Sequence, residues 1–66
     1  MKLIINGDPQ EMSSPLTVRG MLDGLGFGRK PVVVELNRRA LFPREFELTS
    51  LSEDDRVEIV QITAGG

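Results

Sequence analysis

Apolar and polar residues alternate along several short stretches of the chain, as they do in half-buried β-strands. The first stretch runs into Asn6-Gly7, a step that favours a two-residue hairpin turn. Pro43 ends the fourth stretch, because proline cannot continue the hydrogen bonding of a strand. We therefore expect strands at residues 2–6, about 10–13, 31–37, about 40–42 and 56–62.

One segment repeats its apolar residues at helical spacing instead. Thr17 can accept a hydrogen bond as the N-cap, and Gly26 is a natural left-handed stop, so the helix is expected at residues 18–25. The residues that form its apolar stripe are Val18, Met21, Leu22 and Leu25. This stripe should face the core.

The predicted order is strand, strand, helix and three further strands, with an irregular stretch at 48–51 that places a leucine in the core. The helix is the one element able to cover a face of the sheet, and two layers around one core satisfy the packing of a small domain. The order is that of the α+β class and the β-grasp (ubiquitin-like) arrangement: one mixed sheet of about four to five strands with one main helix across one face. In that arrangement the first and last strands lie side by side. We expect a single domain at residues 1–62 and a flexible C-terminal tail at 63–66.

The last strand has an unusual outer face. Its alternation sets Val57, Ile59 and Gln61 against Glu58, Val60 and Ile62. If Glu58 marks the solvent side, Val60 and Ile62 are exposed aliphatic residues beside the tail, and Ile4 on the first strand could extend them. Such a patch is either ordinary surface or a protein-binding surface.

Charged segments give three further candidates. Arg44, together with Arg38 and Arg39, forms a modest basic cluster that is either solvated turn charge or a docking site for an acidic partner surface. The acids at 53–55 lack the spaced oxygen ligands of a calcium loop and are expected to form a turn. The glycine-rich segment 24–30 follows a helix, whereas a phosphate-binding loop precedes one. We expect neither a metal nor a cofactor to be bound.

Composition narrows the function further. The chain has 66 residues and contains no histidine, cysteine, tyrosine or tryptophan, so the commonest general base and metal ligand are missing. The net charge of −2 is opposite in sign to the positive charge typical of nucleic-acid-binding proteins. No apolar run approaches the roughly 18 residues of a membrane span. We expect a cytoplasmic carrier or binding protein that contacts neither nucleic acid nor membrane, rather than an enzyme.

The sequence closes with Thr63, Ala64, Gly65 and Gly66. Two residues without Cβ before a terminal carboxylate could enter a slot too narrow for side chains. The tail is thus expected to be a substrate for a partner enzyme, with Gly66 as the reacting residue. The alternative is a frayed terminus without a role.

Taken together, these features resemble the ubiquitin-like sulfur carriers, and most closely the ThiS family of thiazole (thiamine) biosynthesis. The similarity covers essentially the whole chain. It is carried by MKLIING at residues 1–7, TVRGML at 17–22, VVELN at 33–37, FPREF at 42–46, VEIV at 57–60 and AGG at 64–66. Two positions depart from the family pattern: Phe46 replaces a common tryptophan, and Asp54 replaces the glycine of a Gly-Asp turn.

The resemblance implies a chemistry for the tail. An E1-like adenylyltransferase of the ThiF type would use ATP to adenylate the Gly66 carboxylate, and a sulfur donor protein would then supply the sulfur of a thiocarboxylate. The thiocarboxylate would deliver this sulfur to thiazole synthase of the ThiG type. ATP and magnesium would belong to those partners and not to this chain.

Other functions fit parts of the pattern. A small sulfur carrier of the molybdopterin-synthase type uses the same tail chemistry, although such carriers often have prolines just before the tail and residues 61–64 contain none. A ubiquitin-like protein modifier would form conjugates with lysines. A non-catalytic docking module would not need the Gly66 carboxylate.

Overall fold

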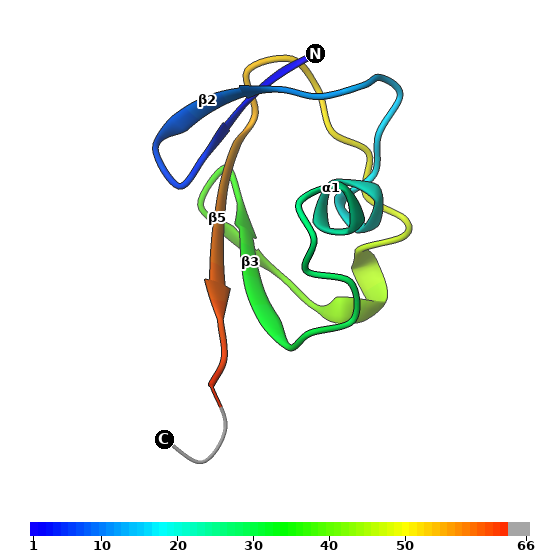
Figure 1. Ribbon diagram of the computed structural model, residues 1–66, viewed down its shortest axis with the longest axis vertical. Coiled ribbons are helices and arrows are strands. Elements are labelled where there is room, and N and C mark those ends of the chain that lie inside the picture. Colours follow the sequence, from blue (N-terminus) through cyan, green and yellow to red (C-terminus); the bar gives the residue numbers. More distant parts are fainter. Residues whose placement is uncertain (64–66) are drawn as a thin grey trace.

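A computed structural model describes residues 1–63 of the chain as five strands, one α-helix and one 3-10 turn (Figure 1). The elements in chain order are β1 (Lys2–Ile5), β2 (Asp8–Glu11), α1 (Val18–Gly24), β3 (Val32–Leu36), β4 (Arg39–Leu41), η1 (Pro43–Glu45) and β5 (Arg56–Gln61). Each predicted strand and the predicted helix is present, so the expected element order is confirmed.

The strands form one mixed sheet in the order β2-β1-β5-β3-β4. β5 lies at its centre, parallel to β1 and antiparallel to β3. The parallel pair joins the first strand to the last, which confirms the predicted neighbours and the β-grasp arrangement. The C-terminal strand is consequently held between two others along its first part.

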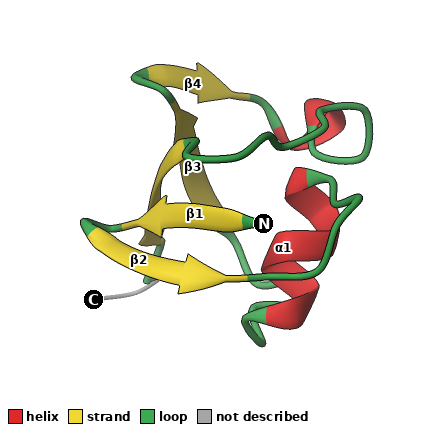
Figure 2. Cartoon of the chain, turned by 90° about the horizontal axis from the view of Figure 1, so that it is seen from above, coloured by secondary structure: helices red, strands yellow, loops and turns green. Residues whose placement is uncertain are grey.

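Helix α1 packs across one face of the sheet (Figure 2). The core between these two layers is apolar throughout and contains no buried polar or charged side chain among the described residues. Its residues are Leu3, Ile5, Val18, Met21, Leu22, Val32, Val34, Leu41, Phe46, Leu51, Val57 and Ile59. In residues 1–63, no element covers the opposite sheet face (Figure 2). No helix of this part of the chain has the length and apolar character needed to cross a bilayer.

Two tight turns with left-handed residues fix the strand register. Asn6 and Gly7 have φ of 49° and 85°, and Ile5 pairs with Asp8 directly across them. Asn37 and Arg38 have φ of 50° and 71° and connect β3 to β4 in the same way. Asparagine tolerates this conformation better than most residues, and glycine adopts it without steric cost.

These turns correct three predicted boundaries. Strand β2 begins at Asp8 rather than near residue 10, because the turn uses two residues only and the chain pairs again at once. For the same reason β4 begins at Arg39. It ends at Leu41 instead of Phe42, because Phe42 is the N-cap of η1. In the irregular stretch, Leu51 is the buried leucine whereas Leu48 is 84% exposed.

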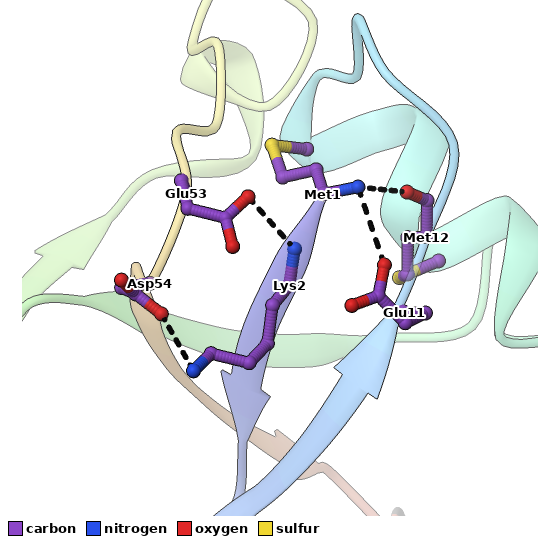
Figure 3. Close-up of polar contacts among 6 residues, drawn as sticks. All are labelled: Met1, Lys2, Glu11, Met12, Glu53 and Asp54. Carbon is purple, nitrogen blue, oxygen red and sulfur yellow. Dashed lines mark hydrogen bonds and ion pairs between the residues drawn. The ribbon is translucent and has the colours of Figure 1, made fainter.

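Polar contacts tie the N-terminal strand to the segment before β5 (Figure 3). The Lys2 ammonium lies 3.0 Å from the Asp54 carboxylate, and the Lys2 backbone N–H donates to Glu53 Oε1 at 3.1 Å. Asp54 has φ of 68°, and its own N–H donates to the Lys2 carbonyl. A left-handed residue is therefore required at this position, which explains why the glycine of the family pattern could be replaced by an aspartate.

Candidate functional site

The end of β5 brings the chain to the tail along the open sheet face. Val60 pairs with Val33, and Gln61 pairs with Val32. The Ile62 N–H then donates to the Pro31 carbonyl at 3.0 Å, so regular pairing with the β3 side continues to this residue. Thr63 is the last described residue and is exposed. The predicted tail residues Ala64, Gly65 and Gly66 lie outside the described part of the chain.

On its other side, β5 loses its strand partner earlier. Pairing with β1 ends where Ile5 meets Val57, since the chain turns away at Asn6. The Asn6 side chain takes over: Ile59 N–H donates to Asn6 Oδ1 at 2.7 Å, and Asn6 Nδ2 donates to the Ile59 carbonyl at 3.2 Å. This amide extends the parallel ladder by one step. Beyond Ile59, the described strand pairs with β3 alone.

Four apolar side chains are exposed around this end of the strand. Val60 is 61% exposed and lies directly opposite Val33 on β3, which is 44% exposed. Phe42 follows the buried Leu41 and lies on the outer face at the end of β4. We call Val33, Phe42, Val60 and Ile62 the apolar patch. Val33 and Val60 are register partners on the neighbouring strands β3 and β5, Ile62 directly follows β5, and Phe42 directly follows β4. Exposed apolar side chains that gather in this way commonly mark a protein-binding site.

Five residues were proposed from sequence as a partner surface, and three of them lie together at the end of the chain's last strand. Val60, Ile62 and Glu58 are all exposed and alternate with the buried Val57 and Ile59, as predicted.

Ile4 and Arg44 lie at the margins. Ile4 shares this face but pairs with Arg56 and is half-buried, so it is two same-face positions of β5 away from Val60 and does not belong to the apolar patch. The Arg44 guanidinium lies 4.6 Å from the centre of the Phe42 ring, where the cation can interact with the aromatic face. Arg44 therefore borders the patch.

Sequence reasoning missed Val33 and Phe42 as members of this surface. The signal for Val33 was present, because it alternates with the buried Val32 and Val34 and shares a face with Glu35. Only the strand order, however, places it opposite Val60. Phe42 was assigned to a strand without a stated face, and its exposure follows from the pairing of Leu41 with Val34.

Charged residues surround the patch unevenly. Glu35 and Glu58 lie directly opposite each other on β3 and β5, on the outer face and next to the Val33 and Val60 pair. At η1, the Arg44 guanidinium lies over the Phe42 ring. The patch is thus bordered by two carboxylates along the strands and by one guanidinium at η1.

The remaining electrostatic feature is far from this surface. The hydrogen bond to Asp54 and the charge of that carboxylate raise the pKa of Lys2 above its ordinary value of 10.5. Within residues 1–63, no group of three His, Cys, Asp or Glu side chains is placed to hold a metal ion.

Comparison with known proteins relates the whole chain to one family. Residues 3–66 match the ThiS family. The fold superposes on the crystal structure of the thiamine biosynthesis protein ThiS from Geobacter metallireducens with a TM-score of 0.85 and 32% identity, and the match covers 100% of both chains. A thiazole synthase from Magnetococcus marinus is 36% identical over 66 residues, but the chain spans only 20% of its length. A protein named ycf40 from Porphyra purpurea is 37% identical over 62 residues, which cover 94% of this chain and 87% of that protein.

Proposed function

The chain belongs to the ThiS family, and from this membership we propose that it carries sulfur for thiazole formation in thiamine biosynthesis. In this role the protein is a co-substrate of partner enzymes, not a catalyst. The observation that supports the proposal most is that the family match includes Gly65 and Gly66 and not only the folded body. The similarity to the thiamine biosynthesis protein ThiS from Geobacter metallireducens favours the thiamine pathway over the molybdopterin-type alternative.

The proposed chemistry takes place at the Gly66 carboxylate. A carboxylate is a poor electrophile because it is negatively charged and has no good leaving group. An E1-like adenylyltransferase would join it to the AMP part of ATP and release pyrophosphate. Hydrosulfide (HS⁻) supplied by a donor protein would then attack the carbonyl carbon and displace AMP, so that a C–S bond replaces the C–O bond to AMP. The resulting thiocarboxylate is largely ionised near neutral pH, and an ionised sulfur is the more nucleophilic form.

The folded body contributes position. Residues 63–66 act as a tail that, when extended, reaches at most about 14 Å beyond Ile62. A partner that receives Gly66 must therefore approach the end of β5 closely. The apolar patch lies at that end, which supports its role as the docking surface for the partner. Glu58 and Arg44 border this surface, whereas Ile4 lies at its far margin.

A relative supports the identity of the second partner. The matching thiazole synthase from Magnetococcus marinus contains a region similar to this entire chain within a much longer protein. A carrier region and a synthase named for the thiazole product in one polypeptide are consistent with delivery of sulfur from the first to the second. We propose a thiazole synthase as the acceptor of the sulfur carried here.

The proposal is tested by intact-mass analysis. The purified chain is incubated with ATP, a sulfur donor and its cognate E1-like enzyme, and the C-terminal fragment is then sequenced by mass spectrometry. The expected result is the replacement of one oxygen by sulfur at Gly66, dependent on ATP. An unchanged mass, under conditions in which the same enzyme activates an established carrier, would contradict the proposal. Conjugates to lysines of other proteins would instead indicate a modifier.

A further inference from the structure

Two acidic side chains face each other on the open face without a counterion. Glu35 on β3 and Glu58 on β5 are register partners, and both are exposed. Side chains directly opposite each other have Cβ atoms about 5 Å apart, and like charges at that distance destabilise a sheet. Among the ion pairs of residues 1–63, none involves Glu35, Glu58 or the neighbouring Arg56.

This acidic pair is continuous with the apolar patch. The next pair along the same two strands toward the tail is Val33 with Val60, so carboxylates and apolar side chains form one surface. Arg44, which borders the patch, lies over the Phe42 ring.

We infer that the partner surface seated on the apolar patch is itself apolar and carries an arginine or lysine side chain that enters between Glu35 and Glu58. One cation between two carboxylates removes their mutual repulsion and gains charge-assisted hydrogen bonds. Because apolar contacts carry little directional information, the cation also fixes the orientation of the carrier on the partner. The inference rests on the proposed function, since the partner considered is the E1-like enzyme that adenylates Gly66.

The acidic pair is tested with the full-length double variant Glu35→Gln/Glu58→Gln. Glutamine keeps the shape of the side chain and removes the charge. The matched control is Asp23→Asn/Glu47→Gln, which changes the net charge equally at exposed positions of α1 and the segment after η1. Binding of each variant to the E1-like enzyme is measured by calorimetry at several salt concentrations.

The expected result is binding weakened about tenfold or more for Glu35→Gln/Glu58→Gln, with a weaker dependence on salt, and no such change for the control. The melting temperature of the Glu35→Gln/Glu58→Gln variant should be equal or higher, because a repulsive pair has been removed. A structural role would lower the melting temperature together with the affinity.

Equal affinities for the variant and its control would overturn the inference. So would sedimentation that shows a dimer of the unmodified chain broken by the same substitutions, because a second copy would then be the occupant of this face. Failure of the proposed function has a different signature. In that case the unmodified chain would not be adenylated even at saturating concentration, whatever the effect of the glutamates on binding.

Discussion

Strand β5 is held differently at its two ends. At its start, the Asn37 side chain accepts a hydrogen bond from the Arg56 N–H at 2.9 Å, and the Asn37 N–H donates to the Arg56 carbonyl. Asn6 holds Ile59 from the other side. At its end, Val60 and Gln61 have β3 as their one strand partner, and apolar side chains face solvent.

This difference separates two tasks within one strand. The side-chain amides of Asn6 and Asn37 hold the first part of β5 between β1 and β3, so this part is fixed within the folded domain. The last part leaves one edge and one face accessible at the place where the tail begins. A carrier needs both properties, because a partner must approach the tail closely while the domain keeps its shape.

The largest effect on thiocarboxylate formation is expected for the glycines that follow β5 in the sequence. Deletion of Gly66 or the substitution Gly65→Val should lower thiocarboxylate formation by at least about a hundredfold, because a missing or displaced carboxylate cannot reach the adenylating site. The melting temperature should remain unchanged, because the core of the described part of the chain is formed by residues 3–59. Mass spectrometry of the time course measures the rate, and circular dichroism measures the melting. A normal rate for either variant would show that thiocarboxylate formation requires neither Gly66 nor a residue without a side chain before it.

The clamped part of the strand should respond in the opposite way. Asn6→Ala removes two side-chain hydrogen bonds to Ile59 and places at φ of 49° a residue that tolerates the left-handed conformation less well than asparagine, which together should cost about 2 to 3 kcal/mol of unfolding free energy. Asn6→Gly loses the same hydrogen bonds but tolerates the positive φ, so its cost should be smaller, about 1 to 2 kcal/mol. Urea unfolding measures both.

Thiocarboxylate formation distinguishes a residue that stabilises the domain from one that contacts the partner. At a temperature where the Asn6 variants remain folded, their thiocarboxylate formation at saturating carrier should be near normal. If Asn6→Ala instead lost transfer without losing stability, Asn6 would belong to the partner surface and the contrast between the two ends of β5 would fail.

The sequence predicts most of this architecture because its signals are local. The alternation of residues 56–62, the Thr17 cap and the Asn6-Gly7 turn each depend on neighbours in the chain. The side chain of Thr17 does accept a hydrogen bond from the Gly20 N–H at 3.1 Å. The adjacency of β1 and β5 was inferred from the β-grasp arrangement, because alternation alone does not specify it.

The surface was harder to predict because it is assembled from strands distant in the chain. Val60 and Ile62 could be named from alternation, but Val33 and Phe42 join them through the pairing of β3 with β5 and β4. Ile4 was included on the same reasoning and lies too far along the sheet, because the register of the parallel pair sets it beside Arg56. Facing residues can thus be predicted from one strand, whereas the extent of a patch depends on register.

The smallest effect is expected for the ion pair between Lys2 and Asp54, which lies just before the start of β5. The pKa of Lys2 is raised by the hydrogen bond to Asp54 and by its charge, so the folded protein binds this proton more tightly than the unfolded chain does. The stabilisation is therefore complete below the ordinary value of 10.5 and disappears as the pH rises through the higher folded value. The difference in unfolding free energy between the unmodified protein and Lys2→Met should be constant near pH 9 and shrink above about pH 10.5. Two further variants serve as controls. Lys30→Met removes the same charge and controls for net charge. Asp54→Gly keeps the left-handed turn and removes the partner of Lys2. In the Asp54→Gly background the Lys2→Met difference should be smaller and vary less over this range. A difference that grows with pH would mean that Lys2 is stabilised in its neutral form and that the ion pair does not help to hold the start of β5.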